Sequence, residues 1–259
     1  NKKEKSPRFQ TFWTRELPLD LYASRYDFLL SLVIFVLSML IGIVSVMQNS
    51  EFVRLILGDQ YVNMTLENIE KGDPLAVYGQ MGEFPMFVMI TANNVWVSFV
   101  VFVFGLLTPL GTAFHLFRNG VMVGAFQAFF YQHSLLTVSS LTIFLHGTLE
   151  LSAIVLAGGA GIMLGRSMLF PGTLPRKTAF MKGVRHGTRT MLGLVPFFLV
   201  AGFIESFITR YYDQISMFVV FLIIGVSMFV IIGYFVWYPL YLHKKLNTKK
   251  PNYDEILTN

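Results

Sequence analysis

LTIFLHGTLELSAIVLAGGAGIMLG, residues 141–165, is the stretch of sequence that decides the fold. Its 25 residues contain one acidic residue, Glu150, and neither a basic residue nor a proline. A helix rises about 1.5 Å per residue, so a helix of this length crosses the roughly 30 Å hydrocarbon core of a bilayer. The stretch therefore predicts a transmembrane helix with an acid near its middle.

One face of this predicted helix combines polar and small side chains. A charged carboxylate near the centre of a span costs at least about 2.5–3.5 kcal/mol, so Glu150 is expected to face protein or water rather than lipid. Small residues spaced by four positions let a second helix approach closely, and we interpret Gly158, Gly161 and Gly165 as helix-packing positions. In order, the face carries Thr142, His146, Glu150, Ala153, Ala157, Gly161 and Gly165.

The composition of the whole chain is that of a membrane protein. Of its 259 residues, 54% are hydrophobic and 14% are charged, whereas a soluble domain averages about 25% charged residues. The absence of cysteine excludes disulfides and thiolate metal sites. The net charge is +5, but no basic stripe with interleaved aromatic residues accompanies it, so we predict no nucleic-acid binding. Because the first residue is Asn1, we expect a preceding N-terminal region.

Hydrophobic segments long enough to cross a bilayer predict an all-α, polytopic membrane protein with six transmembrane helices. The predicted spans are 28–47, 86–107, 114–131, 138–165, 190–208 and 215–238, which form a membrane domain over residues 28–238. The remaining segments are a cytoplasmic basic linker with an interfacial amphipathic helix (1–27), an acidic outer loop (48–85), a basic inner loop (166–189) and a basic cytoplasmic tail (239–259). Spans two and three either cross fully or form a re-entrant hairpin.

The N-terminal segment carries an amphipathic pattern. Its apolar residues are spaced i, i+3, i+4 and i+8, and Pro18 is expected to end the helix. One interpretation is a short helix that lies on the membrane surface. The other is an ordinary lead-in that packs on further cytoplasmic domains. The apolar positions are Phe9, Phe12, Trp13 and Leu17.

The distribution of basic residues orients the chain. With the N-terminus inside, the inner segments hold seventeen Lys and Arg residues, and the outer segments hold three, namely Arg54, Lys71 and Arg210. This is a strong positive-inside asymmetry, which predicts that both termini are cytoplasmic and that the number of crossings is even. It also explains the net positive charge through affinity for the anionic inner leaflet. We therefore expect a multi-pass membrane protein with both termini in the cytoplasm.

His146 and Glu150 lie one turn apart on the central span and allow three interpretations. They hold neighbouring helices in register through hydrogen bonds, they form part of a proton or ion relay, or they act as a hydrolytic pair. An intramembrane acid is a functional candidate by default. A zinc site needs three or four ligands, and these two residues do not complete one, so we predict no metal, no cofactor and no catalytic residue.

Glu205 lies three residues inside the outer end of its predicted span. It is expected to pair with Arg210, to meet His133 of the neighbouring outer loop, or to reach the interface as a solvated acid. The last of these is the simplest structural interpretation, because acids near the end of a span reach water readily.

Three further polar residues belong to the predicted intramembrane cluster. Asn93 and Asn94 are interpreted as hydrogen-bonding positions between helices, worth roughly 0.6 kcal/mol per contact. Arg118 opens the third span, where it either balances a buried carboxylate or anchors the inner end. Its depth argues against a contact with Glu150.

Several motifs together resemble the stage II sporulation protein M family, in the form found in Bacteroidota. The resemblance covers nearly the whole chain, and HGTLE followed by the Ala/Gly run and FPGT is its most specific part. The motifs are ILGDQYVNMT (56–65), NIEKGDPLAVY (68–78), NNVWVSF (93–99), RNGVMVG (118–124), HGTLELSAIVLAGGAGIMLG (146–165), LFPGTLPR (169–176) and IESFITRYY (204–212).

The resemblance implies a non-enzymatic scaffold subunit of a multiprotein envelope complex, in the inner (cytoplasmic) membrane of a bacterium. Family members of this form are typically encoded beside MoxR-type AAA ATPases, RDD-family membrane proteins and DUF58 proteins, which implies partners of these kinds in a hetero-complex or a homo-oligomer. The alternative is a permease or channel-like module with a polar path through His146, Glu150 and Glu205. An intramembrane hydrolase that uses His146 with Glu150 is a third hypothesis.

Overall fold

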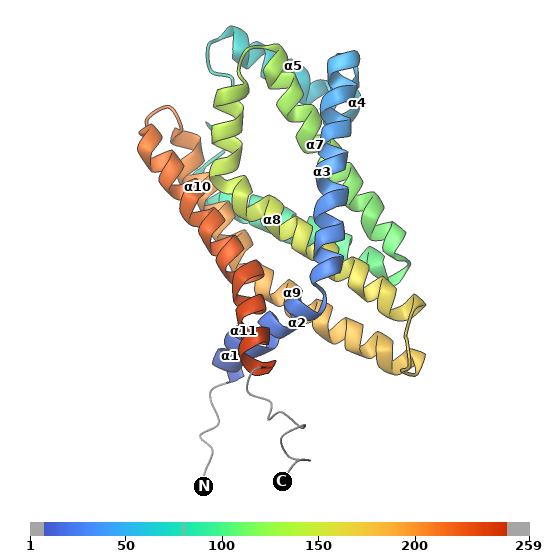
Figure 1. The fold of residues 1–259 in the computed structure, drawn as a ribbon. Helices are drawn as coiled ribbons and strands as arrows, with labels where there is room; N and C mark the ends of the chain where they lie inside the picture. Colours follow the sequence, from blue (N-terminus) through green and yellow to red (C-terminus); the bar gives the residue numbers. More distant parts are fainter. Residues whose placement is uncertain (1–7, 80, 248–259) are drawn as a thin grey trace, which may run out of the picture.

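The structure is a computed structural model that describes residues 8–79 and 81–247, and its secondary structure over these residues is all helical, as predicted. Figure 1 shows long helices that cross at different angles, with α1 and α11, the first and last described helices, at the same end. The long helices are α3 (Arg25–Gln48), α6 (Glu83–Val103), α7 (Pro109–Gln132), α8 (Leu136–Leu169), α9 (Arg176–Phe203) and α10 (Met217–Ile231). The short α-helices are α1 (Arg8–Thr11), α2 (Leu17–Ala23), α4 (Phe52–Leu57), α5 (Asp59–Glu70) and α11 (Tyr238–Asn247). The 3₁₀ and π segments are η1 (Phe12–Glu16), η2 (Ala76–Gly79), η3 (Phe104–Leu106), η4 (Ile204–Ile208), η5 (Thr209–Tyr211) and η6 (Ile232–Trp237).

Five helices of the described chain are long and apolar enough to cross a membrane, which agrees with a polytopic membrane protein. They cover Arg25–Gln48, Glu83–Leu106, Leu136–Leu169, Arg176–Tyr211 and Met217–Asn247. The third predicted span, 114–131, lies in α7, which is outside this set. With 24 residues, α7 is about 36 Å long, so its length alone would suffice for a crossing.

α7 lacks an apolar stretch of the kind found in the five candidate spans, and its neighbours cover much of its surface. Gly120 and Gly124 bring its backbone against the backbone of α3 at Phe35 and Met39, so that the two helices run parallel. Ten residues of α7 are buried, and a helix shielded in this way can hold polar side chains without exposing them to lipid. Six crossings therefore remain a prediction from the sequence.

α8 is the central helix of the molecule. In its apolar window 83% of the residues are buried in the protein, against 17–39% in the four other candidate spans. Figure 1 shows α8 descending from the top, bending and then crossing the molecule. Gly158, Gly161 and Gly165 lie against Leu116, Thr112 and Pro109 of α7, and Gly161 also meets the backbone of Gly105 in η3.

Both predicted loops contain more helix than the sequence suggested. The outer loop, 48–85, contains α4, α5 and η2. In the inner loop, 166–189, the end of α8 is followed by the first half of α9. Ala179, Gly183 and Gly187 are buried at a spacing of four, so this half of α9 is amphipathic. Its exposed basic residues are Arg176, Lys177, Lys182 and Arg185.

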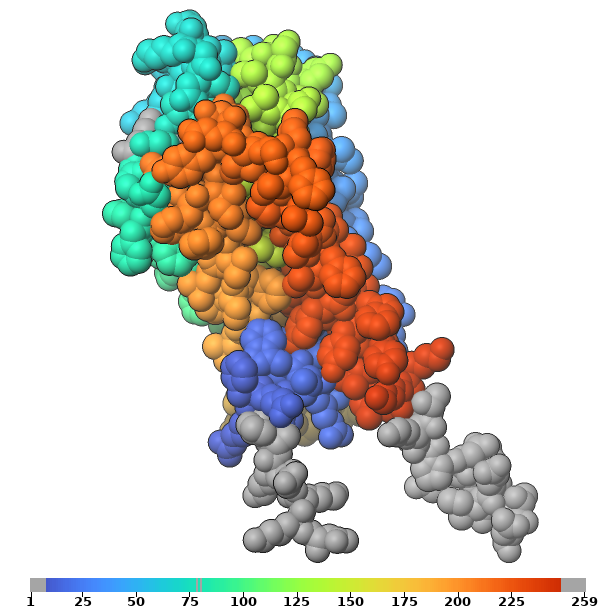
Figure 2. Space-filling model, turned by 90° about the vertical axis from the view of Figure 1, so that its left-hand side faces the viewer, coloured from blue at the N-terminus to red at the C-terminus, as the bar shows by residue number. Residues whose placement is uncertain are grey.

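The N-terminal helices dock on the protein's own α9 and η6, at the base of the face shown in Figure 2. Leu17 and Leu21 are buried, and the hydroxyl of Tyr234 donates a 2.8 Å hydrogen bond to the carbonyl oxygen of Trp13. Pro18 does not end the helix, because it occupies the first turn of α2, where its missing N–H is tolerated. The rest of the predicted linker (1–7) and of the predicted tail (248–259) lies outside the described residues.

Candidate functional site

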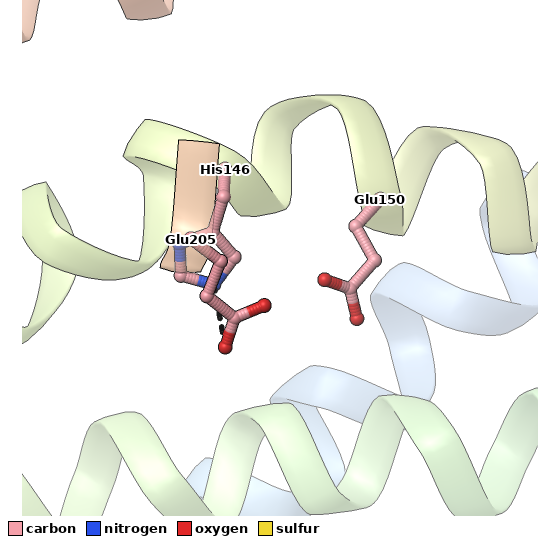
Figure 3. Close-up of side chains that lie close together, drawn as sticks. All are labelled: His146, Glu150 and Glu205. Atoms are coloured by element: carbon pink, nitrogen blue, oxygen red, sulfur yellow. Dashed lines mark ion pairs between the residues drawn. The ribbon is translucent and has the colours of Figure 1, made fainter. Parts of the chain in front are cut away.

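The candidate site is a cluster of three ionisable side chains inside the helical body. His146 and Glu150 lie one turn apart on α8, and Glu205 comes from the π-helical segment η4. One nitrogen or oxygen atom of each residue lies within 4.8 Å of the corresponding atoms of the other two. Figure 3 shows the three side chains pointing into the same space. The structure thus brings together the three residues of the predicted polar path.

The imidazole of His146 is held from two sides. Its Nε2 atom lies 3.8 Å from Oε1 of Glu205, a pair drawn as a dashed line in Figure 3. Its Nδ1 atom lies 3.2 Å from the hydroxyl oxygen of Thr209. The side chains of His146 and Glu205 are 7% and 14% exposed. The Thr209 contact fixes the ring orientation that turns Nε2 toward the carboxylates.

The position of Glu205 differs from the prediction. Neither Arg210 nor His133 pairs with it: Arg210 lies 3.2 Å from a carboxylate oxygen of Glu83, and His133 contacts the carbonyl oxygen of Phe129. The carboxylate of Glu205 turns inward instead of toward the interface. π-helical turns widen a helix and shift the register of its side chains, and they are frequent at functional sites.

A polar face of α6 borders the cluster. Thr91, Asn94 and Ser98 lie on this face, and the side chain of Asn94 lies beside the carboxylate of Glu150. The sequence analysis identified only Asn94, although the spacing i, i+3, i+7 was visible as a polar stripe. Thr209, Ser206 and Gln127 likewise carry buried polar groups that the sequence did not single out.

Buried polar atoms on α6 and η4, the two elements that supply Asn94 and Glu205, have no hydrogen-bond partner within the described residues. They are Oγ1 of Thr91, Nδ2 of Asn94, Oγ of Ser98 and Oγ of Ser206. A buried polar group without a partner costs about 1–3 kcal/mol. Such groups are few in natural proteins, so their concentration here indicates a place that meets a polar ligand or water.

The other predicted site residues occupy different places. Asn93 is exposed on α6 and donates a 3.4 Å hydrogen bond to Oδ1 of Asn94. Arg118 is exposed on α7, away from the cluster. Gly158, Gly161 and Gly165 lie at helix–helix contacts, as described above.

An apolar groove of about 610 Å³ lies beside the cluster, between α8, α9, η4 and α10. Its lining does not include the three ionisable residues, so it offers no polar route to them. Part of its wall is made by two residues adjacent in sequence to the cluster, Leu149 and Ile204.

Comparison with known proteins gives one family. A family model described as Stage II sporulation protein M matches residues 31–210, which include most of α3, all of α6, α7 and α8, and all three ionisable residues of the cluster. No curated protein and no solved structure matches the chain.

Proposed function

The chain belongs to the Stage II sporulation protein M family, and on that premise we propose that this membrane protein is a non-enzymatic scaffold subunit of an envelope complex in the bacterial inner membrane. The observation that supports this most directly is the interlocked interior around α8. A protein that positions others needs a rigid body, and contact between helix backbones at glycine supplies one.

The interior is fixed by polar contacts between distant parts of the chain as well as by glycine. The hydroxyl of Ser31 on α3 donates a 2.6 Å hydrogen bond to the carbonyl oxygen of Val155 on α8. The guanidinium of Arg166 makes two hydrogen bonds of 2.8 and 2.7 Å to the carboxylate of Asp27, so the start of α3 is clamped to the end of α8. Bidentate pairs of this kind add geometric specificity.

The two ends of the molecule offer surfaces of opposite charge for partners. The outer end, in α4, α5 and the turns beside them, carries exposed acids: Glu51, Asp59, Glu67, Glu70 and Asp73. The inner end, in α9 and α11, carries exposed bases: Arg176, Lys177, Lys182, Arg185, Lys244 and Lys245. We propose that periplasmic partners meet the acidic surface, and that a MoxR-type AAA ATPase or RDD-family membrane protein meets the inner end. Charge complementarity of this kind sets specificity and association rate.

The proposal is tested by isolating the full chain from native membranes under mild conditions. We expect a defined complex that contains at least one RDD-family or AAA ATPase component. A fourfold replacement of the inner bases on α9 by glutamine should release the cytoplasmic component. A matched replacement of the five outer acids should leave it bound. A monomer without partners in native membranes would contradict the scaffold role.

A second candidate function is supported by the polar cluster itself. Two carboxylates and an imidazole in the protein interior, bordered by unpartnered polar atoms, suit a path for protons or small cations. If this holds, Glu150→Gln abolishes ion flux in proteoliposomes while the complex still assembles. If the scaffold role is the whole function, there is no ion flux for Glu150→Gln to abolish. The variant then either assembles normally or weakens assembly.

A further inference from the structure

We propose that His146, Glu150 and Glu205 bind one divalent transition-metal ion of the zinc or manganese type. From the sequence we expected no metal here, because His146 and Glu150 of α8 supply only two ligands. The third ligand comes from η4, 55 residues beyond Glu150, and the fold brings it into place. The inference concerns this site alone and does not depend on the scaffold function.

The spacing of the three side chains fits coordination after a small closure. Their nearest nitrogen and oxygen atoms lie within 4.8 Å of one another. Zinc bonds to nitrogen and oxygen are about 2.0–2.2 Å long, which separates two ligand atoms by roughly 3.4 Å in a tetrahedron. The pair formed by Nε2 of His146 and Oε1 of Glu205 is already at 3.8 Å. Rotation of the flexible glutamate side chains covers the remaining distance.

The groups behind the ligands are those that metal sites use. A ligating histidine usually binds a second group through its other ring nitrogen, which fixes the tautomer and the ring plane. Here Nδ1 of His146 contacts the hydroxyl of Thr209, and Nε2 is left facing the carboxylates. Ligating carboxylates usually have such an outer partner too, and the Asn94 amide, whose Nδ2 has no hydrogen-bond partner in the described structure, lies beside Glu150, where it could serve as one.

The charge of the cluster also calls for a cation. Two carboxylates close together in a protein interior repel each other and are costly to bury unpaired. Within residues 8–79 and 81–247 no lysine or arginine forms an ion pair with Glu150 or Glu205. A doubly charged cation between the two carboxylates and a neutral imidazole makes the cluster neutral, which removes this cost.

Unpartnered side chains provide an independent indication of a ligand. Asn94 is 5% exposed and Ser206 is fully buried, and each has a polar atom without a partner in the described structure. Asn94 lies beside Glu150, one of the three proposed ligands, so its unpartnered amide borders the cluster. With three protein ligands a fourth position stays open, and a water there would give these groups a hydrogen-bond partner.

The donor set selects the class of metal. One imidazole and two carboxylates suit zinc, manganese or ferrous iron, whereas magnesium and calcium prefer oxygen ligands alone. The chain has no cysteine, so thiolate-seeking ions such as copper(I) are disfavoured.

The test uses the full chain, purified in detergent with a tag that contains no histidine, stripped with a chelator and reloaded with Zn²⁺ or Mn²⁺ alone. Metal content is measured by mass spectrometry after gel filtration. We expect about one ion per wild-type chain, and at least about 100-fold weaker binding in Glu150→Gln and Glu205→Gln, since even loss of an outer partner of a ligand costs 10–100-fold. The matched control is Glu83→Gln, which changes the same group outside the cluster and should retain the ion.

Two results would overturn the proposal: a wild-type chain that retains no ion, or Glu205→Gln that binds as well as the control. If the variants do not yield a folded protein, X-ray absorption of the zinc-loaded wild type decides the matter. One imidazole with oxygen ligands supports the site, whereas two or more imidazoles place the ion elsewhere and refute it.

Discussion

The contact of Gly161 with α7 gives the sharpest stability prediction. A methyl group added at this position would lie 2.5 Å from Oγ1 of Thr112 and 3.0 Å from the carbonyl oxygen of Val101, whereas ordinary contacts are 3.4–4 Å. Thr112 cannot rotate away freely, because its hydroxyl donates a 2.9 Å hydrogen bond to Val101. Gly161→Ala therefore forces the helices apart by about 0.9 Å, and overpacking of this kind costs about 1–3 kcal/mol.

The measurement is thermal unfolding of the purified variant, with Gly225→Ala as the matched control. Both substitutions replace a glycine by alanine in a helix and therefore gain the same helix propensity. A methyl group at Gly225 would meet nothing within 4 Å, so Gly225→Ala shows this gain without a clash. At about 2–4 °C per kcal/mol for a chain of this size, Gly161→Ala should melt about 2–12 °C below the control. Equal melting temperatures would refute the close contact between α8 and α7.

Three further predictions concern other parts of the chain. Arg166→Gln should destabilise the protein by about 1–3 kcal/mol in thermal unfolding, because it leaves the buried carboxylate of Asp27 without its partner. In an Asp27→Asn background, which has no carboxylate there, the same substitution should cost much less. Leu17→Ala should cost about 2–5 kcal/mol, since Leu17 is fully buried; an unchanged melting temperature would show that α2 does not dock. Burial raises the pKa of Tyr61 above its usual value of 10.0, against a hydrogen bond with Thr65. As the pH rises, the Tyr61 hydroxyl therefore loses its proton at a lower pH in the unfolded state than in the folded state, and stability should fall above about pH 10. Tyr61→Phe should reduce that fall in melting curves recorded at alkaline pH.

Local patterns predicted the central helix and its packing well. Residues 141–165 carry two signals for this: the length of the apolar segment and the recurrence of small residues on one face. Both follow from the geometry of a single helix, so both are visible in the sequence. The glycines of this face lie at helix–helix contacts in the structure. The clustering of His146 with Glu150 followed from the same period, because residues four apart share a face.

What the sequence did not predict depended on contacts between distant segments. The inward turn of Glu205 arises from a π-helical segment, which shifts a side chain away from the position that a regular helix would give it. Residues 114–131 of α7 were predicted as a span in the same way as the others. The polar side chains that α7 can hold depend on its burial against α3, which is a contact with a distant segment. Pro18 was interpreted as a stop, but a proline in the first turn of a helix starts one equally well.

The clamp between α3 and α8 has a consequence for biogenesis. Asp27 and Ser31 are synthesised 139 and 124 residues before their partners on α8. While α3 is being inserted, its acid and hydroxyl lack these partners, because the ribosome has not yet synthesised α8. The nascent protein thus completes its tertiary structure late, and an insertase or holding factor that shields α3 during this interval would raise the yield of mature protein.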